Sequence, residues 1–551
     1  MAILTGNIPT SILLCIVFLL TSSLCNNANS AATSSSSSSR DTFCNLTPHP
    51  MFCKSNSPSA TSWDIHDYCR FFVNSSLSLS LKLVKYVIKG QSGSNISSST
   101  LLALKDCQLL GELSADYLSS TLSSINSTST NSSSSQADDL QTLLSATITN
   151  IDTCLGGLQQ ATNSSSDYHL QSLLSNGTMF QSISLAFFKQ GWASTGTGRK
   201  LSEGGYRAWE QRLYELIRAS GRKLLQAPPD NVLVSQMVVV NPDGSANYTT
   251  INDAVNAAPN NTDGSNGFFV IYVVAGTYEE YVSIPKTNKY LMMIGDGINQ
   301  TVITGNRSVA GGWTTFNTAS FAVVAKGFVA VNITFRNTAG AINEQAVAMR
   351  SGADLSAFYY CSFEGYQDTL YTHSMRQFYR NCDIYGTVDF IFGNAAVVLQ
   401  QCNIYPRLPM QGQFNAITAQ GRTDINQNTG TSIHNCTITA ASDLAASNGT
   451  TKTYLGRPWK QYSRTVYMQS FMDSLIDPAG WREWSGSFAL DTLYYAEFDN
   501  WGPGSNTSNR VTWPGYHVIN ATDAINFTVS NFIQGDAWLP ATGVLYDGGL
   551  L

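Results

Sequence analysis

Charged side chains are scarce in this sequence. Of its 551 residues only 12% are Asp, Glu, Lys or Arg, whereas 43% are hydrophobic. This balance is typical of packed globular structure and argues against a disordered chain. The length is suited to two domains.

The sequence also lacks the signatures of two common kinds of catalytic site. No Gly-x-Ser-x-Gly motif is present, and the few histidines, including His373 and His434, stand in no clear register with a serine and an acid. We therefore do not expect a serine triad. The eleven cysteines show neither Cys-x-x-Cys spacing nor pairing with histidine. We expect no zinc, no other metal and no cofactor.

The N-terminal segment lacks Lys and Arg but otherwise has the pattern of a signal peptide. Its apolar run, Ile12–Leu20, is too short to span a bilayer comfortably, and small and polar residues follow around Asn29, Ser30 and Ala31. We predict a signal peptide over residues 1–31 and secretion, with an uncleaved anchor as the alternative. No later segment is expected to span a membrane. Glycosylation sequons, such as the one at Asn247, agree with export.

Cysteines are expected to pair in an exported protein. In the N-terminal half we predict the disulfides Cys44–Cys53 and Cys107–Cys154, which leave Cys69 over. The C-terminal half is expected to contain two further disulfides, and the spacing leaves their connectivity open. The four cysteines concerned are Cys361, Cys382, Cys402 and Cys436.

The residue pattern changes near the middle of the chain. From Cys44 to about Gly191, apolar residues recur at helical spacing, as in Leu101–Leu122, which predicts an all-α helical bundle over residues 40–192. After Val232, short runs rich in Val, Ile, Phe and Tyr are separated by Gly, Asn and Asp, as in all-β domains. We place this second domain at residues 226–551.

Residues 193–225 are predicted to be a linker with processing sites. A dibasic sequence between domains of an exported chain is accessible to proteases. A solvated basic helix is the alternative, because Tyr206–Ile217 has helical character. Besides Arg199-Lys200, the predicted site consists of Arg222, Lys223, Leu224 and Leu225.

Unusual polar residues recur at one interval in the β half. Asp368 and Asp389 are 21 positions apart, and Gln345 and Gln367 are 22 apart. A parallel β-helix stacks coils of about this length, so positions one coil apart lie roughly 4.8 Å from each other on adjacent strands. We predict that these four side chains converge. The alternative is that the two aspartates are ordinary turn residues.

These residue types favour one kind of chemistry. Asp389 lies within an apolar run, where an unpaired carboxylate would be costly, and Arg457, 68 positions later, is the predicted bidentate partner. That pairing would keep Asp389 ionised as a nucleophile, while Asp368 would carry a proton. The amides of Gln345 and Gln367 could stabilise a developing oxyanion. The set suits acyl transfer better than glycoside cleavage, in which positive charge develops at the sugar.

Five ordered motifs in the β half resemble the signature of pectin methylesterases. They are Gly276-Thr277-Tyr278-Glu279-Glu280, Gln345-Ala346-Val347-Ala348, Gly365-Tyr366-Gln367-Asp368-Thr369-Leu370-Tyr371, Gly386-Thr387-Val388-Asp389-Phe390-Ile391-Phe392-Gly393 and Leu455-Gly456-Arg457-Pro458-Trp459. The resemblance extends from about Val232 to the C-terminus. The N-terminal half is similar, more loosely, to the inhibitor-like pro-region of such enzymes, through its cysteine pattern and helical character.

The resemblance implies an all-β, right-handed parallel β-helix as the catalytic domain, preceded by the all-α bundle. It implies that Asp389 is the nucleophile, Asp368 the acid and then the base, and Gln367 a transition-state stabiliser. For Phe392 and Trp484, ordinary packing is an equal alternative to binding. The implied substrate contacts are Thr315, Gln345, Phe392, Arg457, Trp459 and Trp484.

The resemblance also bears on one disulfide. Thr334 stands where some relatives have a cysteine. The expected partner of Cys361 is therefore Cys382.

The resulting hypothesis is a secreted cell-wall enzyme that hydrolyses the methyl esters of homogalacturonan to demethylated pectin and methanol. Its expected partners are pectin, inhibitor proteins and a processing subtilisin-like protease, and the mature form is expected to be a monomer. From Gln226 onward the chain has sixteen basic and twenty-four acidic residues, which gives no support for nucleic-acid binding. The pro-region is expected either to cover the active site or to retain the precursor.

Two other functions stay open. One is a hydrolase or lyase that cleaves the pectin chain, because β-helices serve several polysaccharide chemistries. The other is a non-catalytic wall-binding protein or inhibitor.

Overall fold

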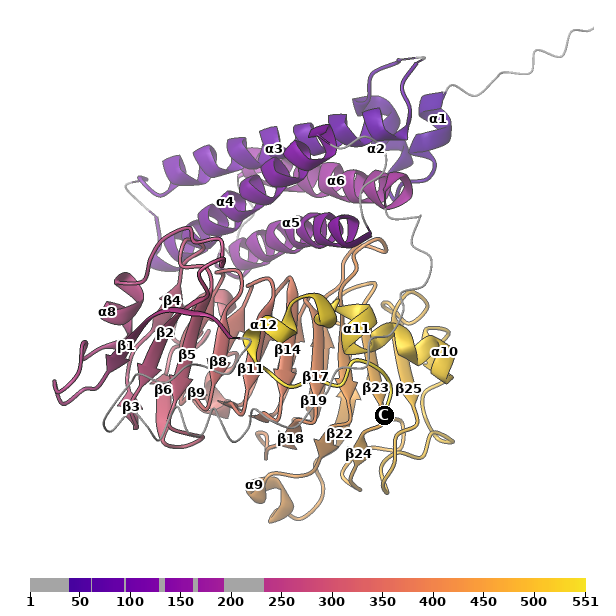
Figure 1. Ribbon diagram of the computed structural model, residues 1–551. Helices are drawn as coiled ribbons and strands as arrows, with labels where there is room; N and C mark the ends of the chain where they lie inside the picture. The colour runs from indigo at the N-terminus through magenta and orange to yellow at the C-terminus, as the bar shows by residue number, and fades with distance from the viewer. Residues whose placement is uncertain (1–38, 61, 94–95, 128–133, 162–166, 193–231) are drawn as a thin grey trace, which may run out of the picture.

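The computed structural model describes residues 39–60, 62–93, 96–127, 134–161, 167–192 and 232–551. Within them, a helical bundle lies along one side of an elongated stack of strands (Figure 1). The predicted signal peptide and the predicted processing site at residues 222–225 lie outside the described residues.

The N-terminal part is the predicted all-α bundle. Its long helices pack around buried aromatic and aliphatic side chains such as Phe72, Leu118, Leu144 and Phe187. The first long helix is capped by Asp64, the residue before it, whose carboxylate accepts hydrogen bonds from the N–H groups of the first turn in a capping box. The helices are α1 (Ser39–Cys44), α2 (Pro50–Asn56), α3 (Ile65–Gly90), α4 (Ser98–Ser127), α5 (Ser134–Ala161) and α6 (Tyr168–Gly191).

Helix α3 differs from one sequence expectation. By length and composition alone it could cross a membrane, although no segment after the N-terminus was expected to. In the bundle its buried side chains pack against α4 and α6. A core helix of a globular domain can be equally long and apolar.

The two predicted N-terminal disulfides are confirmed. Cys44–Cys53 joins α1 to α2, and Cys107–Cys154 joins α4 to α5. Cys69, the cysteine left over by these two pairs, is a buried free thiol.

The C-terminal part is the predicted parallel β-helix, built from three sheets in which every described strand pair is parallel. Small helices complete it, namely α8 (Ile251–Asn256), α9 (Ser442–Ala445), α10 (Ala521–Ala524), α11 (Val529–Phe532) and α12 (Leu539–Thr542). The sheet that faces the bundle consists of β4 (Val282–Ile284), β7 (Phe321–Val323), β10 (Met349–Ser351), β13 (Leu370–Thr372), β16 (Ile391–Gly393), β19 (Asn415–Gln420) and β22 (Thr453–Gly456).

The other two sheets close each coil. One consists of β1 (Val234–Val240), β2 (Phe268–Val273), β5 (Leu291–Gly295), β8 (Val329–Val331), β11 (Ser356–Tyr359), β14 (Arg376–Arg380), β17 (Ala396–Gln400), β20 (Gly430–His434), β23 (Arg464–Met468), β25 (Tyr494–Phe498) and β26 (Tyr516–Val518). The other consists of β3 (Gly276–Tyr278), β6 (Thr301–Gly305), β9 (Thr334–Asn337), β12 (Ser362–Glu364), β15 (Asp383–Gly386), β18 (Asn403–Pro406), β21 (Thr437–Ile438) and β24 (Phe471–Met472). Apolar side chains of all three sheets fill the interior.

The predicted coil length holds at the centre of the β-helix. Met349 of β10 pairs with Leu370 of β13, which pairs with Ile391 of β16, so each step is 21 residues. Positions two residues before each strand are therefore stacked as well. This register places Asp368 beside Asp389.

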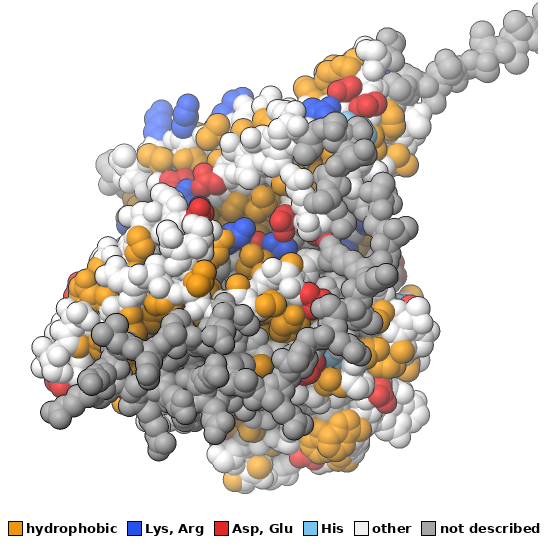
Figure 2. Space-filling view, viewed as in Figure 1, with side chains coloured by type: hydrophobic (Ala, Val, Ile, Leu, Met, Phe, Trp, Pro, Cys, Tyr) orange, Lys and Arg blue, Asp and Glu red, His pale blue; other side chains and the backbone are white. Residues whose placement is uncertain are grey.

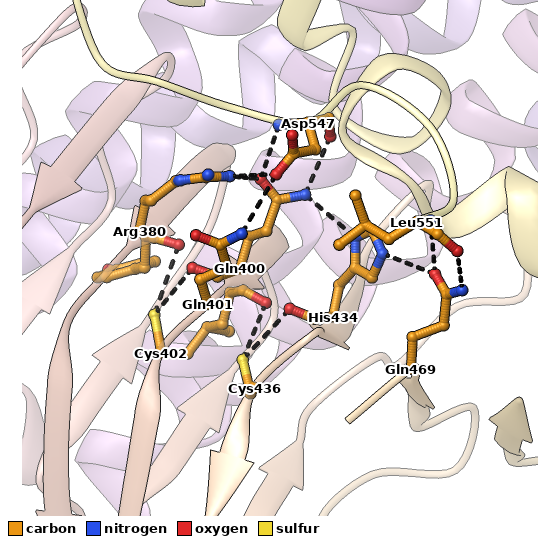
Figure 3. A network of polar contacts seen from close by, with 11 residues as sticks. Arg380, Gln400, Gln401, Cys402, His434, Cys436, Gln469, Asp547 and Leu551 are labelled. Carbon is orange, nitrogen blue, oxygen red and sulfur yellow. Dashed lines mark hydrogen bonds and ion pairs between the residues drawn. The ribbon is translucent and has the colours of Figure 1, made fainter. Parts of the chain in front are cut away.

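The predicted disulfides of the C-terminal half are wrong, because Cys361, Cys382, Cys402 and Cys436 are buried free thiols. They occupy equivalent positions on successive coils, so their Cα–Cβ bonds point the same way rather than toward one another, as a disulfide requires. Each thiol instead donates to backbone carbonyls; Cys436, for example, lies 3.4 Å from the oxygen of Leu399 and 3.5 Å from that of His434 (Figure 3).

The C-terminal segment returns across the largest sheet. Helices α11 and α12 cover its outer face (Figure 1), where Val529, Ile533 and Leu539 pack in one buried cluster with side chains of the strands. Further on, Asp547 binds Arg380 at 2.7 Å and accepts a hydrogen bond from Gln400 at its carbonyl (Figure 3). These contacts hold the C-terminal segment on the outer face of the largest sheet. The segment therefore does not cover the sheet that faces the bundle.

Candidate active site

Asp368 and Asp389 lie just before β13 and β16, on adjacent coils. The Asp368 N–H donates to the carbonyl of Val388 at 3.1 Å, which continues the ladder up to the two carboxylates. Both residues have left-handed backbones, with φ of 62° and 54°. Such a conformation is unfavourable for a residue other than Gly, by about 1 kcal/mol or more, and recurs at functional sites.

Arg457 follows β22 and reaches Asp389 as predicted. Its Nε and Nη2 atoms donate to the two carboxylate oxygens, each at 2.7 Å. The guanidinium also lies 4.2 Å from the ring centroid of Trp484. The carboxylate thus holds the edge of the guanidinium by hydrogen bonds, and the aromatic ring packs against its flat face.

The surroundings of the two carboxyls push their pKa values apart. Burial, reinforced by the charge of Asp389, raises the pKa of Asp368 well above its usual range, and Arg457 opposes this only in part. Burial also raises the pKa of Asp389 above its usual value, but the hydrogen bonds and charge of Arg457 reduce this rise. Asp389 is thus the first of the pair to ionise, and Asp368 retains its proton to higher pH.

The two aspartates line a cavity of about 430 Å³ between the β-helix and the bundle. The buried side-chain oxygen of Gln345 accepts no hydrogen bond from any described residue. All the residues predicted to bind substrate contribute to the lining, namely Thr315, Gln345, Phe392, Arg457, Trp459 and Trp484, together with Gln367.

Aromatic rings form one side of the cavity. Phe392 stacks on Tyr371 at 4.1 Å and meets Trp459 edge-on at 6.0 Å. Trp459 lies against Gly421, where a Cβ atom would come within 2.8 Å of its ring. The Trp459 ring thus needs a glycine beneath it. No role was predicted for Tyr371, although it closes one of the sequence motifs.

The bundle supplies the opposite side of the cavity, although none of its residues was predicted to line it. Helix α5 contributes Asp152, Thr153 and Gln160 to the lining. The Thr153 hydroxyl lies 2.9 Å from Nε2 of His373, and Gln160 bonds to Thr315 at 3.4 Å. Acidic and basic side chains gather at the hollow between the two parts (Figure 2).

A polar stripe on α5 could have revealed this contact. Thr142, Ser145, Thr149 and Asp152 recur at helical spacing, and the first three are buried although polar. They bond to the β-helix; Asn394, for instance, donates to Thr149 at 2.9 Å. A polar helical face that becomes buried indicates an interface rather than a core.

A second contact of the bundle involves an acid on α4. The carboxylate of Asp106, only 4% exposed, accepts hydrogen bonds from Thr314 at 2.6 Å and from Asn317. Burial raises the pKa of Asp106 to about 7, although Thr314, the nearby Arg350 and Asn317 lower it. Within the described residues, no group of three or more His, Cys, Asp or Glu is placed to hold a metal ion.

Comparison with known proteins identifies two families along the chain. A family model described as Pectinesterase matches residues 237–536, and one described as Plant invertase/pectin methylesterase inhibitor matches residues 38–187. "Probable pectinesterase/pectinesterase inhibitor 41" of Arabidopsis thaliana is 55% identical over 547 residues, covering 93% of this chain and 95% of the relative. "Pectinesterase 2" of Citrus sinensis is 52% identical over 450 residues, covering 81% of this chain and 82% of the relative.

One solved structure bears on the β-helix. "Pectin methylesterase from Carrot" is 53% identical, with a TM-score of 0.56, and covers 59% of this chain and 100% of its own. That share is about the size of the β-helix part of this chain. The chain belongs to the pectinesterase family and carries, ahead of its pectinesterase domain, a domain of the plant invertase/pectin methylesterase inhibitor family.

Proposed function

We propose that the β-helix domain, residues 226–551, hydrolyses the methyl esters of homogalacturonan, giving demethylated pectin and methanol. Asp389 attacks the ester carbonyl, and Asp368 gives its proton to the departing methoxide. The product of this step is methanol and an acyl anhydride on Asp389. Asp368 then takes a proton from water, which attacks the anhydride carbonyl and releases the free acid.

The amides of Gln367 and Gln345 stabilise the oxyanion of each tetrahedral intermediate. Both line the cavity with the reacting carboxyls. Being neutral, they add hydrogen-bond donors without another charge. Phe392, Trp459 and Trp484 bind the sugar rings, and Thr315 and Arg457 complete the substrate contacts.

The observation that carries this proposal is the asymmetric pair of buried carboxyls. Arg457 binds both oxygens of Asp389, while Asp368 has its pKa raised well above the usual range. One ionised and one protonated carboxyl on adjacent coils are a nucleophile and an acid in position.

The test is methanol release from highly methylated pectin by residues 226–551 in the presence of EDTA. We expect wild type to release methanol and Asp389→Asn to lose about 10⁴-fold in kcat, since a nucleophile is removed. Asp383→Asn is the matched control, because Asp383 lies on β15, bonded to Asn403 and away from the cavity. A nearly wild-type rate for Asp389→Asn would contradict the assignment, and new reducing ends or unsaturated products would indicate chain cleavage instead.

We also propose that the bundle, residues 40–192, blocks the active site of the precursor. Support comes from α5, which lines the cavity opposite Asp368 and Asp389. A polysaccharide must lie across the groove in order to present an ester, and α5 takes up that space. Cleavage in residues 193–225, at Arg222–Leu225, by a subtilisin-like protease would free the secreted enzyme to act as a monomer in the cell wall.

A further inference from the structure

Lys460 is the second cation of the groove and directly follows Trp459. Its Nζ lies 2.9 Å and 3.0 Å from the two carboxylate oxygens of Asp152 on α5, and 5.2 Å from the centroid of the Trp459 ring. The two side chains are about a quarter exposed, at 27% for Lys460 and 25% for Asp152. Both line the cavity that contains the reacting carboxyls.

The two cations that the β-helix contributes to the cavity differ in their partners. Arg457 is bound to Asp389 within the same domain. In the part of the chain that the structure describes, Lys460 is paired with an acid of the bundle alone. When the bundle departs, Lys460 is left as an ammonium group without an acidic partner, in the cavity that the two carboxyls also line.

The other ion pairs between the two parts have the same polarity. Asp116 binds Lys286 at 2.6 Å, and Asp139 binds Arg376 at 2.7 Å. In each described pair the bundle supplies the carboxylate and the β-helix the cation. The bundle thus presents carboxylates to the β-helix, as a stretch of demethylated galacturonan would.

From this arrangement we propose that Lys460 binds the free carboxylate of a demethylated galacturonate unit next to the unit undergoing hydrolysis, and that Asp152 occupies this position in the precursor. The inference rests on the proposed function. A methyl ester is neutral and offers an ammonium group no ion pair, whereas the product of each turnover is a carboxylate. Lys460 therefore favours esters beside units that are already demethylated, which leads to contiguous demethylated stretches.

This attraction is local and opposes the charge of the whole domain. From Gln226 onward acidic residues outnumber basic ones by twenty-four to sixteen, so the domain as a whole repels a polyanion. Lys460 restores attraction at one subsite only. The enzyme can then recognise a free acid beside the reacting ester without binding a long demethylated product tightly.

The experiment measures the binding of a demethylated galacturonate oligosaccharide to residues 226–551 by calorimetry at low salt. We expect Lys460→Gln to weaken binding about three- to fivefold, the range of a partly exposed ion pair, and Lys460→Arg to retain it. Lys452→Gln is the matched control, since Lys452 is 65% exposed, pairs with Asp477 and lies outside the cavity lining.

Methanol release gives a second readout. We expect Lys460→Gln to raise KM for partly demethylated pectin, to leave KM for fully methylated pectin unchanged, and to scatter the free acids along the product. Unchanged oligosaccharide binding in Lys460→Gln, or an equal loss in Lys452→Gln, overturns the inference. Failure of the proposed function would show differently, as wild type that binds the oligosaccharide but releases no methanol.

Discussion

The guanidinium of Arg457 contacts Asp389 along one edge and the ring of Trp484 on one face. Its charge favours the ionised form of Asp389 directly and reaches Asp368 more weakly. Arg457 therefore keeps the two carboxyls in different protonation states. Activity should require Asp389 ionised, which sets the acid limb of the pH–rate profile, and Asp368 protonated, which sets the alkaline limb.

Removing the cation should move the acid limb. In Arg457→Gln the Asp389 carboxylate loses its partner, so its pKa rises and the acid limb of kcat/KM shifts upward by about one to three pH units. Arg457→Lys keeps the positive charge but loses the paired hydrogen bonds of the guanidinium, so we expect a smaller shift of the acid limb.

The control for this prediction is Arg336→Gln. Arg336 pairs with Glu364 at 2.6 Å on another sheet. The measurement is kcat/KM from pH 4 to 9 for the three variants, which gives the position of the acid limb in each. An unmoved acid limb in Arg457→Gln would show that Arg457 does not set the charge of Asp389.

Single residues were predictable from the sequence where an unusual polar group recurred in an apolar setting. Asp389 within its apolar run and the 21-residue interval to Asp368 were enough to predict that the two carboxyls lie side by side. The contact between His373 and Thr153 was not predictable from the sequence. Burial together with the charge of Arg350 lowers the pKa of His373 to about 3. Its surroundings come from two distant segments, and no spacing along the chain encodes that contact.

At the scale of elements, the four stacked cysteines show where a sequence rule misleads. Export favours disulfides, and the 21-residue step from Cys361 to Cys382 places these residues on neighbouring strands. Parallel strands in register repeat one side-chain direction, so proximity does not bring two sulfur atoms face to face. Coil length was therefore predictable, and the absence of disulfides between these coils was not.

The thiols can be counted directly. Residues 226–551, unfolded in guanidinium without reductant, should take up four alkyl groups, because all four cysteines of this part are free. A reductant should leave the thermal unfolding midpoint of this fragment unchanged. The intact precursor is the control, since reduction should open Cys44–Cys53 and Cys107–Cys154 and lower the stability of the bundle, by about 2–4 kcal/mol per disulfide. Mass spectrometry that finds fewer than four alkyl groups on the fragment would contradict the structure.

At the scale of the whole molecule, docking of the bundle is linked to protons. The pKa of Asp106 rises from the ordinary 3.8 to about 7 in the docked precursor, so docking takes up a proton between these values. This contribution is complete below about pH 4 and is lost as the pH rises through 7. His373 acts in the opposite sense, because its pKa is lowered, and its contribution is lost as the pH falls below 6.5 toward 3.

We therefore expect the precursor to be less inhibited at pH 8 than at pH 6. The measurement is the specific activity of uncut precursor divided by that of residues 226–551 at each pH, which cancels the pH dependence of catalysis. Asp106→Asn cannot ionise and should abolish the rise above pH 6, while Asp116→Asn, which removes a more exposed carboxylate of the same face, should retain it. Equal activity of precursor and fragment at every pH would contradict blocking by the bundle.

The register of the β-helix has one further consequence. Asp368 and Asp389 project from equivalent positions of adjacent coils. The spacing between hydrogen-bonded strands therefore sets the distance between the two carboxyl groups. Inserting or deleting a whole coil elsewhere would lengthen or shorten the groove and leave that distance unchanged. A slip of one residue between β13 and β16 would instead turn one carboxyl into the apolar interior. The spacing of the two carboxyls is thus insensitive to changes in the length of the loops and sensitive to a shift of register between the two strands.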